Sequence, residues 1–222
     1  MKKRSTKIGT YDTAAHGWTL TGWQLSDPEQ KTTYVEKAGG DGSWDLSTSL
    51  TDGIPRYKDR SLTITLECSQ GTREDRERLI DEMVNNLDGF TWSIVPPDKP
   101  GHYLTGRVHV AVNYSDLAHA AVTIKATCGP WIYREKETIV VLTGPTALEE
   151  YTLRNSGRLV VVPQITMTGA RVSLRFGEAS HVFTSPGTYE WPEMALTPGA
   201  HTLRHSISDG TVTIRYREAV LR

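Results

Sequence analysis

The sequence has few of the features that mark disulfide-rich or membrane proteins. Its 222 residues include only two cysteines, Cys68 and Cys128. Two cysteines are too few for a disulfide framework in a chain of this length, and they lack the spacing of a zinc site. The longest aliphatic runs, residues 139–142 and 159–162, are far shorter than the roughly 18 residues of a membrane span. We expect two small buried cysteines and no membrane helix. Because each cysteine ends a predicted strand, a disulfide between neighbouring strands also stays open.

The sequence also lacks an excess of charge of one sign. It has 25 Lys and Arg against 26 Asp and Glu, a net charge of −1, with no basic stripe. Neutralising phosphates requires clustered basic residues, so the composition argues against a nucleic-acid-binding protein.

Catalytic signatures are missing as well. The sequence contains no GxGxxG, Walker A, GxSxG or HExxH motif. His201 and His205 are four residues apart on a predicted strand, about 13 Å from each other, which is too far to share one metal ion. We predict that the protein is not an enzyme and needs no metal or cofactor.

Alternating apolar and polar residues predict a mainly β protein. Residues 61–68, 107–114 and 121–127 have the period of two that is typical of half-buried strands, and the last two are expected to pair antiparallel. One helix is predicted to begin after Thr72, with Asp75 completing a capping box, and to end at Asp88-Gly89. Its apolar stripe comprises Leu79, Ile80, Met83, Val84 and Leu87.

A change in composition predicts two domains, residues 1–138 and 139–222. All nine lysines and five of the six tryptophans lie in the first part, and a Gly- and Pro-bearing connector covers residues 134–147. Short strands separated by turn residues predict a β-sandwich in the second part. Its clearest hairpin is predicted to join residues 201–208 and 211–217 through Asp209-Gly210.

The order of motifs along the chain resembles the distal tail (Dit) proteins of long-tailed siphophages. The motifs are Gly40-Asp41-Gly42-Ser43-Trp44-Asp45-Leu46, Tyr57 with Arg60, the single helix, Leu87-Asp88-Gly89, Tyr103-Leu104-Thr105-Gly106-Arg107 and Cys128-Gly129-Pro130-Trp131. Asn155-Ser156-Gly157 and the closing Tyr216 to Leu221 are similar to the family's galectin-like second domain. Ala219 departs from the glycine expected in the closing turn.

The resemblance implies a fold and a role. The first domain would be an antiparallel sheet or split barrel with one helix, similar to tail-tube proteins, and the second a galectin-like β-sandwich. Six copies would form a ring-shaped hub on the tail tube, with the second domain radiating outward. The implied partners are the tail tube protein, a tail-associated lysin or fibre protein and a receptor-binding protein. The protein would be assembled in the bacterial cytoplasm and lie at the virion tail tip.

Subunit-interface candidates follow from the resemblance and from local chemistry. Glycine turns fix the direction of the chain. An arginine can donate two hydrogen bonds to a carboxylate, either in its own subunit or across an interface. The candidates are Asp41, Gly42, Asp45, Tyr57, Arg60, Gly106 and Arg107. The alternative function is a carbohydrate-binding β-sandwich protein, in which Tyr189 and Trp191 would form the surface that contacts a sugar or a partner.

Overall fold

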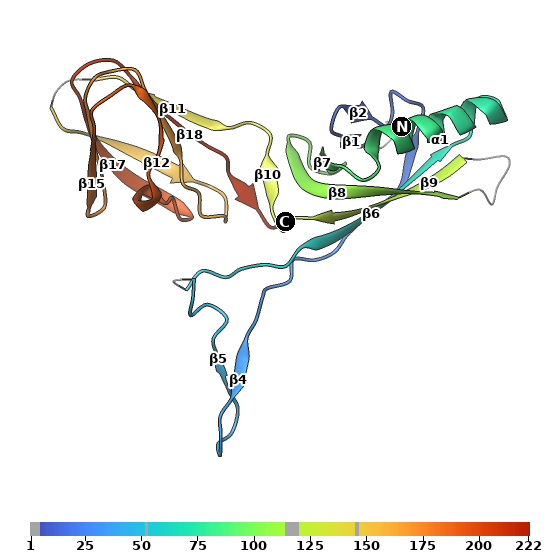
Figure 1. The fold of residues 1–222 in the computed structure, drawn as a ribbon, viewed down its shortest axis with the longest axis horizontal. Helices are drawn as coiled ribbons and strands as arrows, with labels where there is room; N and C mark the ends of the chain where they lie inside the picture. Colours follow the sequence, from blue (N-terminus) through green and yellow to red (C-terminus); the bar gives the residue numbers. More distant parts are fainter. Residues whose placement is uncertain (1–4, 52, 114–119, 145–146) are drawn as a thin grey trace. The chain divides into compact units, whose positions relative to one another are not determined.

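The chain folds into two compact units (Figure 1). The computed structural model describes residues 5–51, 53–113, 120–144 and 147–222. The first unit extends to Ile132 and includes Arg222, and the second comprises Tyr133–Leu221. The predicted division between residues 138 and 139 stays a prediction, which the proteolysis experiment below tests.

The first unit is built on one antiparallel sheet. Its strands follow the order β2-β1-β7-β8-β9-β6-β3. The elements of this unit are β1 (Lys7–Ile8), β2 (Tyr11–Asp12), β3 (Thr19–Leu25), β4 (Tyr34–Glu36), β5 (Ser43–Asp45), β6 (Arg60–Cys68), α1 (Arg73–Leu87), β7 (Thr91–Ile94), β8 (His102–Asn113) and β9 (Ala120–Cys128). Strands β4 and β5 form a separate two-stranded sheet.

The central strands have one buried and one solvated face. Strands β6, β8 and β9 pair antiparallel, with Ile64 opposite Ile124 and Ile124 opposite Val110. The alternation in the sequence places these apolar side chains on one face, while Thr63, Lys125 and their same-parity neighbours lie on the other. The predicted strands and the pairing of β8 with β9 are confirmed. Tyr114 and the predicted linker 115–119 lie outside the described residues.

Helix α1 covers the buried face, close to β8 and β9 (Figure 1). Its predicted capping box is confirmed, because the Asp75 N–H donates to Thr72 Oγ1 and the Thr72 N–H donates to the Asp75 carboxylate. Ile80, Met83 and Leu87 are buried, while Leu79 and Val84 are half-buried at the edges of the predicted stripe.

Replacing Met83 with alanine is expected to destabilise the first unit by about 2 to 4 kcal/mol, because Met83 is fully buried and the shorter side chain leaves a cavity. Thermal unfolding followed by circular dichroism measures the change. Asn86→Ala, at an exposed position of the same helix, is the control and is expected to change stability by less than about 0.5 kcal/mol. Equally small shifts for both variants would contradict packing of the helix on the sheet.

The second unit is a β-sandwich of two four-stranded antiparallel sheets. One sheet has the order β11-β18-β13-β16 and the other β12-β17-β14-β15. The bounds are β11 (Thr138–Leu142), β12 (Glu149–Asn155), β13 (Gln164–Met167), β14 (Val172–Phe176), β15 (Ala179–Phe183), β16 (Gly187–Glu190), β17 (Gly199–Ile207) and β18 (Val212–Tyr216). Two short strands, β10 (Ile132–Arg134) and β19 (Ala219–Val220), pair with each other, and a 3₁₀ turn covers Pro192–Met194. Inward side chains of both sheets form one apolar core.

The hairpin predicted around Asp209-Gly210 is wrong. Strand β17 pairs with β12 and β14, whereas β18 pairs with β11 and β13 in the opposite sheet. The two turn residues therefore connect the sheets across the core. Leu203, Ile207 and Ile214 are nevertheless buried as predicted, because the period of two gives each strand an inward face whichever sheet it joins.

Both cysteines are buried thiols. Cys128 lies opposite Arg60 at one end of the β6–β9 pair and Cys68 opposite Ala120 at the other, so antiparallel pairing separates the two by the length of the strands. The disulfide that the sequence left open is not formed. Burial raises the pKa of the Cys128 thiol to about 11, so this group is protonated at neutral pH.

Limited trypsin digestion is expected to cut after the exposed Lys136 and to leave stable fragments of about 15 and about 10 kDa, since compact domains resist proteolysis better than connectors do. The second fragment carries eight arginines and no lysine, so its survival reports folding rather than a lack of cleavage sites. Mass spectrometry identifies the boundary. Uniform degradation without these fragments would contradict a boundary in this region.

Candidate functional site

An extended arm interrupts the main sheet of the first unit between β3 and β6 (Figure 1). We define the arm as residues 27–59, with the β4–β5 hairpin as its tip. In the hairpin, Tyr34 lies opposite Asp45 and Val35 opposite Trp44. An isolated two-stranded hairpin is only marginally stable in water. The hairpin therefore needs further contacts to be stable, which makes the arm a candidate segment for contact with another chain.

The arm exposes most of the large apolar side chains on the described surface of the first unit. Trp44 is 61% and Leu50 97% exposed, and Tyr34, Val35 and Leu46 are also exposed; the sixth such residue, Phe90, lies outside the arm. The Lys37 ammonium lies 5.0 Å from the centre of the Trp44 ring, a cation–π contact on one face of that ring. Large exposed apolar groups on one segment mark an interaction surface.

The predicted interface residues Asp41, Gly42 and Asp45 lie at the tip of the arm, all exposed. Gly42 has a φ of 76°, which favours glycine, as expected for a tight turn. Hydrogen bonds from the Ser47 hydroxyl and main-chain N–H hold the pKa of Asp45 below its ordinary value. The carboxylate of Asp45 is therefore ionised and orders the end of the hairpin.

Tyr57 and Arg60 lie at the base of the arm, separate from the carboxylates of the tip. The Arg60 Nε donates to the main-chain oxygen of Ser26 at 2.7 Å, and Arg60 is buried. This burial lowers the pKa of its guanidinium. The Tyr57 ring contacts Trp131 edge to face. Both residues thus anchor the arm in their own chain.

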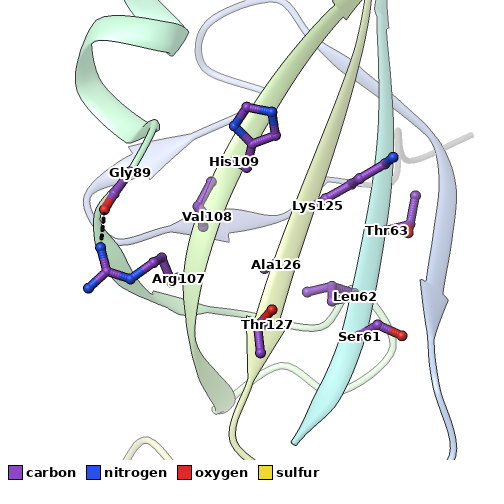
Figure 2. A pocket seen from close by; sticks show the side chains of 10 residues that line it. All are labelled: Ser61, Leu62, Thr63, Gly89, Arg107, Val108, His109, Lys125, Ala126 and Thr127. Carbon is purple, nitrogen blue, oxygen red and sulfur yellow. Dashed lines mark hydrogen bonds between the residues drawn. The ribbon is translucent and has the colours of Figure 1, made fainter.

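The solvated face of the main sheet forms a second candidate surface, shown in Figure 2. A shallow cavity of about 460 Å³ lies over β6, β8 and β9. Lys125 lies opposite both Thr63 and His109, while Arg107 lies opposite Thr127 in the neighbouring row. The face is therefore rich in hydroxyl groups, with Arg107, His109 and Lys125 as its basic side chains.

Two of these basic groups are held by the end of helix α1. Arg107 Nη1 donates to the Gly89 oxygen at 2.6 Å, and His109 Nδ1 lies 2.9 Å from the Asp88 carboxylate. The Val110 N–H also donates to this carboxylate and is the main reason why the pKa of Asp88 is lowered. Asp88 partly balances the positive charge of this face.

Gly106 serves the internal packing of the sheet. A Cβ at this position would lie 2.5 Å from the Cys128 Sγ and 2.9 Å from the Thr127 oxygen, so β8 and β9 approach too closely for a side chain there. Gly106 is buried, whereas its neighbour Arg107 is exposed. Of this predicted pair, Arg107 alone presents a side chain to the surface.

Trp191 is buried, so it cannot stack on a sugar as the sequence suggested. The Trp191 side chain is 6% exposed and belongs to the sandwich core. Tyr189 is half-buried, and its hydroxyl donates to the Ser185 oxygen at 2.8 Å. The pair therefore forms no open aromatic surface, since stacking needs an accessible ring face.

The sequence reasoning missed several residues that the structure brings together. His109 and Lys125 join Arg107 only through the register of β8 and β9, which motif spacing does not reveal. The exposure of Tyr34 and Leu50 was not predicted, because no motif in the sequence marks either apolar residue as exposed. For Tyr34, the glycine-rich turn at residues 39–42 was the available sign of an exposed hairpin.

Within the described part of the chain, no cluster of three or more His, Cys, Asp or Glu residues is arranged to hold a metal ion. No helix among the described residues is long and apolar enough to cross a membrane.

Comparison with known proteins identifies the fold. No protein-family model matches the sequence, and no curated protein matches it significantly. Among solved structures, the chain is similar to the Dit protein (gp 19.1) of phage SPP1, described as a paradigm of the hub adsorption apparatus in phages that infect Gram-positive bacteria. The TM-score is 0.69 at 15% identity, and the match covers 96% of this chain and 98% of that protein. The chain therefore has a Dit-like, mainly β fold.

Proposed function

We propose that this protein is the hub subunit of a phage tail tip, in which six copies form a ring. The observation that carries the proposal is the similarity to the SPP1 hub protein along almost the whole chain, both units included. Because fold alone does not determine function, the proposal also needs a surface suited to assembly.

The arm supplies such a surface. A homomeric ring requires a heterologous interface, in which one surface of each subunit contacts a different surface of the next. The exposed Trp44 and Leu50 belong to a segment that is anchored at its base by Arg60 and extends from the sheet. We assign the arm to the subunit interface, with Asp41, Gly42 and Asp45 at its tip. Tyr57 and Arg60 support it from within the chain.

The proposed position in the virion follows from the hub role. The ring would join the tail tube to the tail tip, where a lysin or fibre protein and a receptor-binding protein attach, and the second unit would radiate outward. DNA leaving the tail would pass through the ring. The near-neutral composition, 25 Lys and Arg against 26 Asp and Glu, suits a ring that does not retain DNA. The hub would assemble in the bacterial cytoplasm before it becomes part of the virion tail tip.

Carbohydrate binding by an isolated sandwich protein is the alternative function. It has less support, because Trp191 is buried and the first unit would have no role. The structural neighbour is a hub protein rather than an enzyme, and we extend this non-enzymatic role to the present chain.

The mass of the purified protein in solution tests the proposal. We expect a particle of about six times the 24.7 kDa monomer, and a ring by negative-stain electron microscopy. A protein that stays monomeric at high concentration and forms no ring even with tail proteins present contradicts the hub role. Monomers with measurable affinity for glycans would favour the alternative.

A further inference from the structure

Two of the edge strands in the described part of the second unit, β11 and β15, lack the charged residues and prolines that usually protect a sheet edge. The edges of its two sheets are β11, β16, β12 and β15. Strand β12 carries Glu149, Glu150 and Arg154, and β16 ends in Glu190 and directly follows Pro186. Charges and prolines of this kind prevent edge strands from pairing with other chains. Strand β11, Thr-Ile-Val-Val-Leu, contains no charged residue, proline or glycine, and neither does β15, which instead carries the exposed polar residues Ser180 and His181.

The side chains of β11 that point outward are also apolar. Ile139 and Val141 are 53% and 59% exposed, while Val140 and Leu142 pack on the core. Directly opposite, on the outer face of β18, lie Arg215 and Thr213. An outer sheet face in water is expected to be polar throughout, so the two apolar residues stand out at the open edge.

One paired set of charges lies just before β11. Glu137 lies 2.9 Å from Arg217, and Arg217 Nη1 donates to the main-chain oxygen of Glu135 at 2.8 Å. Residues 138–142 carry no charge themselves, and the edge presents Ile139 and Val141 beside Arg215, with main-chain N–H and C=O groups on its open side. A neutral segment with alternate apolar side chains is complementary to it.

We propose that the open edge of β11 binds an extended segment of a partner protein as an added β-strand. Main-chain hydrogen bonds along residues 138–142 would supply affinity, and contact with Ile139 and Val141 would select apolar residues at alternate positions. This inference concerns the second unit and does not depend on ring formation.

The size of the edge favours a peptide segment over a second folded copy. Five residues of strand edge with two side chains bury on the order of a few hundred Å², whereas a stable interface between folded proteins buries about 800 Å² on each partner. An extended segment needs no such area, because it can continue into further contacts elsewhere.

Hydrogen–deuterium exchange of the full-length protein tests the proposal. The probe is a neutral synthetic peptide of alternating valine and threonine residues with blocked ends, added at millimolar concentration. We expect exchange at residues 138–142 to slow at least tenfold with saturating peptide. In Ile139→Lys, where a charge is placed on the edge, at least tenfold more peptide should be needed.

Val182→Lys is the matched control. Val182 is 43% exposed on β15, an edge of the other sheet, and this variant should bind the peptide like the unmodified protein. Thermal unfolding checks that both variants are folded. The proposal is overturned by unchanged exchange at residues 138–142, by equal loss of binding in both variants, or by protection that grows with protein concentration alone, which would assign the edge to a second copy.

Discussion

Replacing Gly169 with alanine is expected to unfold the second unit or leave it only marginally stable. Gly169 is buried, and a Cβ there would overlap the main-chain oxygen and carbon of Asp209. Unlike the end of a flexible side chain, these main-chain atoms cannot rotate away. The neighbouring chain is held in place, since the Thr168 N–H donates to the Thr211 oxygen at 3.1 Å. Relieving the overlap therefore requires moving the connection between the two sheets.

The expected cost is about 4 kcal/mol or more, within the range of the most damaging single substitutions. A typical domain has only about 5 to 15 kcal/mol of stability in total. Urea unfolding measures the change, and the 10 kDa tryptic fragment should disappear. Gly144→Ala is the control, because its Cβ would meet the nearest described atom, Glu149 Oε2, at an ordinary 3.5 Å. A Gly169→Ala protein with unchanged stability would contradict the close crossing of these segments.

Replacing Trp44 and Leu50 together with serine is expected to dissociate the proposed ring without unfolding the subunit. A buried tryptophan at the centre of an interface typically contributes about 2 kcal/mol or more, which is roughly a 30-fold change in the dissociation constant of one contact. The loss is repeated at every contact of the ring. Both side chains are exposed in the single chain, so its melting temperature should change little.

Analytical ultracentrifugation over a range of concentrations measures this effect. Leu148→Ser is the control, since Leu148 is 59% exposed, close to the 61% of Trp44, but belongs to the second unit. It should leave the ring intact. If the double variant assembles like the unmodified protein, the arm does not form the interface. If the control loses the ring to the same extent, the second unit contributes to the interface instead.

Local patterns in the sequence were sufficient to predict the helix and the central strands. The capping box of Thr72 and Asp75 depends on residues three apart, and the alternation in β6 and β9 depends on neighbours two apart. The ordered motifs also predicted the fold class that the comparison with the SPP1 protein supports. The interface residues and the domain boundary stay predictions.

The sequence by itself determined which face of the central strands and of the helix is apolar, because the period of a strand or helix depends only on the nearest residues. Which strands pair was decided by the tertiary structure. Asp209-Gly210 has the chemistry of a hairpin turn, yet the chain crosses between sheets there, since the close packing of Gly169 against that turn is a contact between residues forty apart. In the same way, Trp44 is exposed and Trp191 buried for a reason that no local pattern contains: one lies on an arm without a covering layer, the other between two sheets.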